Sequence, residues 1–119
     1  MIRDWKDYRG QINAAVKEIG TSNPDLVKAY AAFHHANSAS KHLDAKTREL
    51  IALGVAVSLR CDGCINAHTE AAVRAGASKD EITDALGVAI MVNAGATMVY
   101  SAHVIDAFHA YSQPNEVQP

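Results

Sequence analysis

The fold of this 119-residue chain is decided by residues 44–76, which read DAKTRELIALGVAVSLRCDGCINAHTEAAVRAG. Apolar residues recur in this stretch every three or four positions, the period of a helix with one buried face. Asp44 is a typical N-cap residue, and Gly76 is typical of the position just beyond a helix end. We therefore predict two helices, one over Ala45–Leu59 and one that opens at Cys61–Cys64 and closes at Gly76, joined by a tight turn near Arg60.

Helical signals continue on both sides of this pair and predict about six helices in all. The other four are expected to span roughly residues 3–19, 24–41, 79–92 and 96–111. Ser78 and Glu81 form a capping box at the start of one of them, and Asn93–Gly95 is expected to separate the last two. The prediction is one all-α domain over residues 1–111, followed by a flexible tail over residues 112–119.

Composition restricts the class of protein. Hydrophobic residues make up 49% of the chain and charged residues 20%, with a net charge of −2, which indicates a globular domain without a basic surface for nucleic acid or anionic lipid. Two cysteines are too few for a disulfide-rich secreted scaffold, and the charged N-terminus does not resemble a signal peptide. We therefore expect a soluble, cytoplasmic protein.

The most apolar segment is Ala85–Tyr100. It is interrupted by polar and glycine residues and is shorter than the roughly 20 apolar residues that a membrane span requires. A buried helix pair explains it better. Because the chain is short and rich in small residues, we also expect helix faces to be buried between subunits of a homo-oligomer.

Three reactive side chains share one helix face. Cys61, Cys64 and His68 are spaced i, i+3 and i+7, which places them within an arc of roughly 60°. The two thiols are close enough for a disulfide, and the imidazole can approach the second sulfur. The first turn of a helix stabilises an anion, so we expect thiols with a lowered pKa at the edge of a shallow pocket lined by small side chains. The opposite face, with Asp62, Asn66, Glu70 and Arg74, is interpreted as solvated.

Glu49 is the fourth candidate. It lies on an apolar stripe of the preceding helix, where a carboxylate needs a partner. If the two helices form an antiparallel pair, Glu49 and His68 differ in height by roughly 6 Å, a gap that their side chains can bridge. We therefore expect Glu49 to orient His68, and His68 to act as the base for Cys64.

The pattern Glu49-x11-Cys61-x2-Cys64-x3-His68 resembles the active-site signature of the alkyl hydroperoxidase D-like proteins of the carboxymuconolactone decarboxylase superfamily. The resemblance covers roughly residues 44–108. It implies a single-repeat helical bundle that assembles as a homotrimer or homohexamer, and a thiol peroxidase that needs no cofactor or metal. It implies that Cys64 attacks the peroxide, that Cys61 resolves the intermediate, and that Glu49 and His68 relay the proton.

The resemblance also implies the partners, which are a peroxide or disulfide substrate and an external dithiol or protein reductant. One position departs from the family pattern. The characterised hydroperoxidase has a histidine immediately before its second cysteine, and here that residue is Gly63. This departure favours an alternative function, a general dithiol–disulfide oxidoreductase with little peroxidase activity.

Other interpretations remain open. The superfamily's other chemistry, decarboxylation or lactone processing, works without a cysteine pair, and a non-catalytic scaffold could retain the same stripe. Cys61 and Cys64 could be merely buried cysteines, or could bind structural zinc with His68 and Glu49. His103 and His109 are interpreted as core or subunit-contact residues, and the methionines of the last helices as core residues.

Overall fold

The computed structural model describes residues 1–39 and 41–114, and within these ranges the chain is helical, with no strand. The helices are, in chain order, α1 (Trp5–Ser22), α2 (Pro24–Ser38), α3 (Ala45–Leu59), α4 (Asp62–Arg74), α5 (Lys79–Tyr100) and α6 (Ala102–Ser112). The predicted all-α fold is confirmed. Residues 115–119 of the predicted tail lie outside the described residues.

Local signals in the sequence set the ends of the central helices. The Asp44 carboxylate accepts a hydrogen bond from the Thr47 backbone N–H at 2.7 Å and so caps α3. This bond holds the pKa of Asp44 below its ordinary value. Arg60 ends α3 in the left-handed conformation, with φ of 54°, and the chain turns directly into α4. Gly76 lies in the turn that follows α4. Its φ is 85°, a backbone conformation in which a residue with a side chain would be strained.

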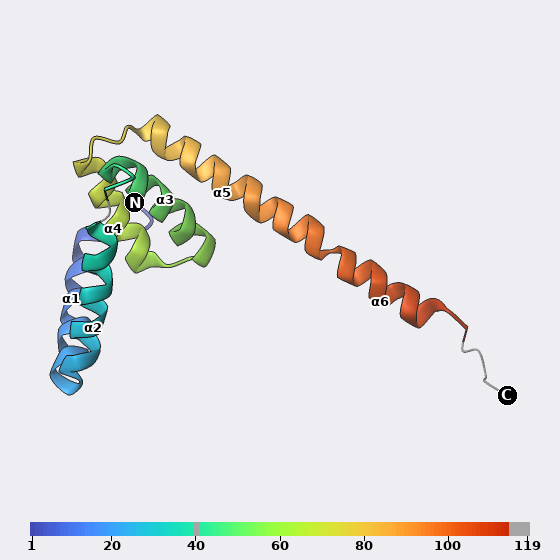
Figure 1. Cartoon of the computed structure of the whole chain (residues 1–119), viewed down its shortest axis with the longest axis horizontal. Helices are drawn as coiled ribbons and strands as arrows, with labels where there is room; N and C mark the ends of the chain where they lie inside the picture. Colours follow the sequence, from blue (N-terminus) through green and yellow to red (C-terminus); the bar gives the residue numbers. More distant parts are fainter. Residues whose placement is uncertain (40, 115–119) are drawn as a thin grey trace.

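Helices α3 and α4 form the centre of the molecule (Figure 1). They pack against each other, α5 packs against α3, and α1 packs against both α2 and α4. The buried hydrophobic residues are Leu53 and Ala56 of α3, Ala72 of α4 and Ala89 of α5. Because three of these four are alanines, the helices approach closely but enclose a very small core.

The face of α4 that was predicted to be solvated contacts α1 and the residues just before it. Asp62 pairs with Arg3 at 3.2 Å, Glu70 pairs with Arg9, and the Asn66 side chain donates a hydrogen bond to the Trp5 carbonyl at 2.6 Å. The prediction therefore holds for Arg74, whose side chain is 77% exposed, and only in part for Asp62 and Glu70, whose side chains are 45% and 38% exposed. Glu70 also pairs with Arg74, four residues further along the same helix.

The second half of α5 continues into α6 as a rod that projects away from the other helices (Figure 1). We call residues 90–112 the arm. The radius of gyration is 21.2 Å, whereas a compact chain of this length has about 13.5 Å. The helical stretch Lys79–Ser112 is long and apolar enough to cross a membrane by length and composition. From the sequence, the apolar segment Ala85–Tyr100 was judged too short for a span, and the helix that contains it is longer than that segment.

The arm corrects two expectations. The helix does not break at Asn93–Gly95, because an internal glycine costs only about 1 kcal/mol and Asn93 bonds to the carbonyl of Ala89 in its own helix. The interruption lies at Ser101 instead. Met91 and Met98, which were predicted to be core residues, are also exposed in this chain, and so are His103 and His109, which were predicted to be core or subunit-contact residues.

Candidate functional site

The two cysteines begin α4. Cys61 is the N-cap residue, and its sulfur accepts a hydrogen bond from the Cys64 backbone N–H at 3.2 Å. Cys64 lies in the first turn. The two residues form a disulfide with a Cα–Cα distance of 5.3 Å, which is in the usual range. Both sulfurs therefore lie at the positive end of the helix, where the peptide dipoles favour a thiolate once the disulfide is reduced.

Glu49 and His68 join the two central helices. The Glu49 Oε2 atom lies 2.7 Å from Nδ1 of His68, and the two side chains are 24% and 30% exposed. The predicted antiparallel packing of α3 on α4 thus brings the carboxylate and the imidazole together. This contact fixes the orientation of the ring and leaves Nε2 as the nitrogen that can exchange a proton with another group.

Cys64 and His68 open into a cleft of about 460 Å³ between α2, α3 and α4. Its apolar walls consist of Tyr30, Phe33, Leu43, Ile51, Ala52, Val55, Ala56 and Leu59. Asn37, His34 and Arg48 add polar groups. A pocket of this composition suits an organic molecule with an apolar body and a reactive polar group.

The lining of the cleft separates the four candidate residues into two pairs. Cys64 and His68 line it, whereas Cys61 and Glu49 do not. A substrate in the cleft would therefore meet the Cys64 sulfur and the His68 ring. Glu49 lies behind the ring, in a positioning role, and Cys61 lies next to Cys64 along the turn.

The large walls were not predicted from the sequence, which suggested small side chains around the pocket. Tyr30 and Phe33 come from α2, a helix for which no role in the site was expected. The signal in the sequence was their i,i+3 spacing, which places two aromatic rings on one face of a helix. Nothing in the sequence indicated that this face is turned toward Cys64.

An ion pair fixes the start of α3 relative to the start of α5. Lys46 Nζ lies 2.8 Å from a carboxylate oxygen of Glu81. The hydrogen bond from Lys46 lowers the pKa of Glu81, and the same contact raises the pKa of Lys46. Glu81 also accepts a hydrogen bond from the Ser78 backbone in the predicted capping box.

The structural zinc interpretation finds no support in the geometry. Across residues 1–39 and 41–114, no three His, Cys, Asp or Glu side chains come together in a way that could hold a metal ion. The four candidates are arranged as a disulfide and a separate histidine–carboxylate pair.

Comparison with known proteins finds relatives whose sequences align with most of this chain. A protein of unassigned function from Haemophilus influenzae is 46% identical over 108 residues, which cover 91% of this chain and 96% of the relative. The uncharacterised protein 4 in the cox locus of Paracoccus denitrificans is 33% identical over 89 residues, covering 75% of this chain and 80% of that protein.

Solved structures share the fold. The apo form of a carboxymuconolactone decarboxylase family protein from Legionella pneumophila matches with a TM-score of 0.70 and 28% identity, covering 92% of this chain and 97% of the other. A protein from Methanobacterium thermoautotrophicum matches with a TM-score of 0.66 and 27% identity, covering 71% and 94%. The family model of the carboxymuconolactone decarboxylase family matches residues 24–107, which contain all four candidate residues. The chain therefore belongs to the carboxymuconolactone decarboxylase family.

Proposed function

We propose that the protein is a thiol peroxidase that reduces hydroperoxides with the Cys61–Cys64 pair. One observation carries the proposal: the sulfur of Cys64 and the ring of His68 line the same apolar cleft, and a carboxylate holds that ring from behind at 2.7 Å. Nucleophilic catalysis requires this arrangement of a nucleophile, an adjacent base and a group that orients the base.

The reaction begins with reduced cysteines. His68, balanced by Glu49, takes the proton of the Cys64 thiol, and the thiolate attacks the terminal oxygen of the hydroperoxide. The O–O bond breaks, the alkoxide leaves as an alcohol with the proton from His68, and Cys64 becomes a sulfenic acid. The peroxide is reduced and the sulfur is oxidised by two electrons.

Cys61 completes the cycle. Its thiol attacks the sulfenic acid sulfur, water leaves, and the Cys61–Cys64 disulfide forms, which is the state of the pair in the structure. An external dithiol or a protein reductant then restores both thiols through a mixed disulfide. The cytoplasm, where we expect the protein, supplies such reductants. We further propose that the working protein is a homo-oligomer, a trimer or a hexamer.

Single cysteine variants test the assignment. Cys64→Ser should abolish hydroperoxide consumption in the presence of a dithiol. Cys61→Ser should still consume one equivalent and then accumulate a sulfenic acid or mixed disulfide, detectable by mass spectrometry. Full activity in Cys64→Ser would refute the assignment of the attacking sulfur.

A second candidate is a dithiol–disulfide oxidoreductase, and the capping of α4 favours it. The Cys61 sulfur accepts a hydrogen bond from the Cys64 backbone N–H. Of the two thiolates, the helix end therefore stabilises that of Cys61 directly. Gly63 also removes the histidine that the hydroperoxidase has next to its second cysteine. Disulfide reduction that exceeds peroxide turnover by orders of magnitude would support this function over the first.

A double substitution distinguishes the family's decarboxylase chemistry from both thiol-dependent functions. Decarboxylation or lactone processing does not need the thiols, so it should survive Cys61→Ser combined with Cys64→Ser. The position of Cys64 in the wall of the cleft favours thiol chemistry, which the same double variant should eliminate.

A further inference from the structure

Asp62 places a negative charge inside the cysteine motif. It directly follows Cys61 and is the acidic residue in the first turn of α4. A carboxylate at this position interacts favourably with the helix dipole. In the reduced protein, however, it opposes the ionisation of both thiols, because a nearby like charge disfavours the charged form of an acid. Without a balancing charge, Asp62 would therefore reduce the amount of thiolate, which is the nucleophilic form of a cysteine.

Arg3 supplies a balancing charge. Its Nη1 atom lies 3.2 Å from a carboxylate oxygen of Asp62. The central carbon of its guanidinium also lies 4.5 Å from the ring centroid of Tyr8 and 5.8 Å from that of Trp5, and the two rings pack edge to face. A guanidinium is attracted to the face of an aromatic ring. These contacts restrict the Arg3 side chain, so less conformational entropy is lost when it pairs with Asp62.

The segment that carries Arg3 is itself fixed to α4. The Asn66 side chain donates a hydrogen bond to the Trp5 carbonyl at 2.6 Å. We call Arg3, Trp5 and Tyr8 the N-terminal clamp. The clamp lies outside residues 24–107, the part of the chain that the family model matches, whereas both cysteines lie within that part. The N-terminal segment thus brings to the redox motif a charge from outside the matched region.

Charged and titratable groups from other elements also surround the cysteine pair. They lie at the cleft or in the turn before α4, and are His34, Arg48, Glu49, Arg60 and His68. Within residues 1–39 and 41–114, however, the ion-pair partner of Asp62 is Arg3. Substitution of Arg3 or Asp62 leaves all the other groups in place.

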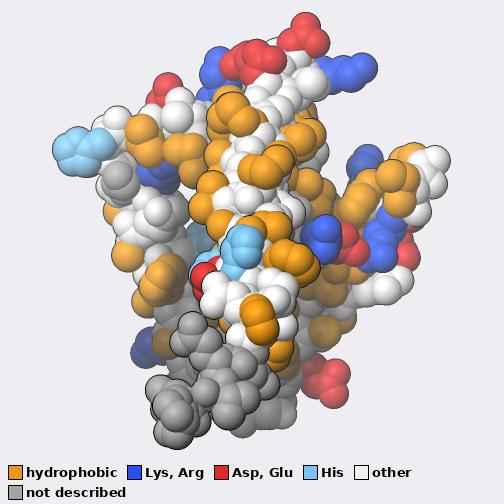
Figure 2. All heavy atoms as spheres, turned by 90° about the vertical axis from the view of Figure 1, so that its right-hand side faces the viewer, with side chains coloured by type: hydrophobic (Ala, Val, Ile, Leu, Met, Phe, Trp, Pro, Cys, Tyr) orange, Lys and Arg blue, Asp and Glu red, His pale blue; other side chains and the backbone are white. Residues whose placement is uncertain are grey.

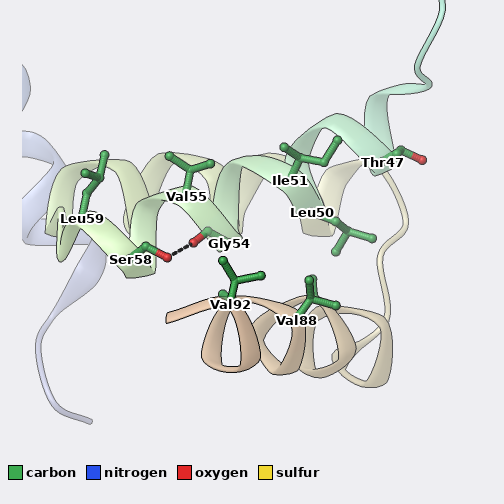
Figure 3. Close-up of a pocket in the computed structure, with 11 residues that line it drawn as sticks. Thr47, Leu50, Ile51, Gly54, Val55, Ser58, Leu59, Val88 and Val92 are labelled. Carbon is green, nitrogen blue, oxygen red and sulfur yellow. Dashed lines mark hydrogen bonds between the residues drawn. The ribbon is translucent and has the colours of Figure 1, made fainter. Parts of the chain in front are cut away.

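The side of α3 that faces α5 adds no charge. The described lining of the groove between these two helices contains no Asp, Glu, Lys, Arg or His residue, and Leu50, Val88 and Val92 face each other across it (Figure 3). The arm carries hydrophobic side chains (Figure 2), and Asp106 is its only Asp, Glu, Lys or Arg residue. Among the described helices, neither α5 nor α6 packs against α4. In the described structure, the charge of Asp62 is therefore balanced from the N-terminal segment.

We propose that Arg3 acts on the redox site through Asp62: it balances the carboxylate charge and thereby stabilises the thiolate form of the reduced Cys61–Cys64 pair. Arg3 is thus a positioning residue and touches no substrate. Stabilising the reduced form makes a disulfide easier to reduce. In that reduction the Cys61–Cys64 bond breaks to give two thiols, and the external dithiol loses two electrons and becomes a disulfide. The benefit for turnover rests on the proposed function, whereas the effect on the equilibrium between disulfide and dithiol does not.

The ionisation of the thiols tests the pathway through Asp62. The pH dependence of alkylation by iodoacetamide reports the pKa of the more acidic thiol in the reduced protein. Arg3→Gln should raise this pKa by about half a unit, because the unbalanced charge acts through partly solvated surroundings. Arg3→Lys keeps the charge and should restore most of the shift.

A double substitution separates this electrostatic effect from a loss of structure. Asp62→Asn should lower the thiol pKa, and Arg3→Gln combined with Asp62→Asn should return it close to the wild-type value, since both charges are then absent. If the combined variant kept a pKa as high as that of Arg3→Gln, Arg3 would act without Asp62 and the proposal would be overturned. An unchanged pKa in Arg3→Gln would overturn it as well.

Equilibration with reduced and oxidised dithiothreitol measures the same effect on the redox equilibrium. About 1.5 units above the measured thiol pKa, Arg3→Gln should lower the ratio of dithiol to disulfide protein about threefold, because half a pKa unit is a threefold change in ionisation. About 1.5 units below that pKa, where the thiols are protonated, the ratio should equal that of the wild type.

Arg9→Gln is the matched control for the equilibrium. It breaks the ion pair between Arg9 and Glu70, which also joins α1 to α4 but lies about 12 Å further along α4 than Asp62. The ratio of dithiol to disulfide should stay at the wild-type value in this variant. An equal loss in Arg9→Gln, or a loss in Arg3→Gln that does not depend on pH, would overturn the proposal. A protein that shows the expected shifts but consumes no hydroperoxide would refute the proposed function alone.

Discussion

Replacing Glu49 with glutamine tests the relay most directly, because the change keeps the shape of the side chain and removes its charge. The contact with His68 is 2.7 Å long, and the two side chains are about three-quarters buried. A hydrogen bond to a charged group contributes roughly 1.5–3 kcal/mol. Since some solvent reaches this pair, we take the loss of transition-state stabilisation in Glu49→Gln as about 1.5–2 kcal/mol. This corresponds to an oxidation rate lower than that of the wild type by about 10- to 30-fold.

The assay is single-turnover oxidation of the reduced protein by an organic hydroperoxide, followed as the loss of free thiol at a series of pH values. The deficit of Glu49→Gln should be largest near pH 6–7 and should shrink above about pH 8.5, where an ordinary thiol ionises without a base. Glu70→Gln is the matched control, because Glu70 pairs with Arg9 and Arg74 on the other side of α4. A Glu49→Gln rate equal to wild type at pH 6–7, or a deficit independent of pH, would refute the relay.

Two further substitutions address the missing histidine and the ion pair between α3 and α5. A Cβ atom at Gly63 would meet nothing within 4 Å, so Gly63→His should fit and should raise peroxide turnover by about 3- to 10-fold at neutral pH, since a second proton donor would assist the leaving oxygen. Steady-state kinetics against Gly63→Ala checks this, and equal rates in the two variants would contradict it. Glu81→Gln should lower the melting temperature at pH 7, because Lys46 lowers the pKa of Glu81 and the pair stabilises the fold above the ordinary carboxyl pKa of 4.5. The difference from wild type should disappear as the pH falls through the lowered pKa of Glu81, and a difference that persists in strong acid would rule out the ion pair as its cause.

The central helices were predictable because their signals are local. Asp44 caps one helix, and the left-handed Arg60 and the positive φ of Gly76 end the two segments close to where the sequence placed their ends. The contact between Glu49 and His68 was also predictable, since the tight turn at Arg60 allows α4 to pack back against α3. Helical periodicity and one tight turn were sufficient for both.

The long C-terminal rod was harder to predict, because residues that break a helix in isolation are tolerated within a long one. Asn93 satisfies its side chain by bonding to Ala89 and to Ser58 of α3, so the helix runs on through Gly95. Met91 and Met98 of this rod were assigned to a core, whereas both are exposed within the chain. Hydrophobicity indicates that a surface is buried, but it does not identify the chain that buries it.

The order of residues along the chain thus determined the central helices, their caps and the grouping of the two cysteines with His68 and Glu49, because each depends on neighbours within a few turns. The tertiary structure alone decided that Tyr30 and Phe33 of α2 form a wall of the cleft, that α1 covers the polar face of α4, and that the arm stands free. These features depend on contacts between segments far apart in the chain. Helical spacing shows which residues share a face, but only the packing of whole helices shows what that face meets.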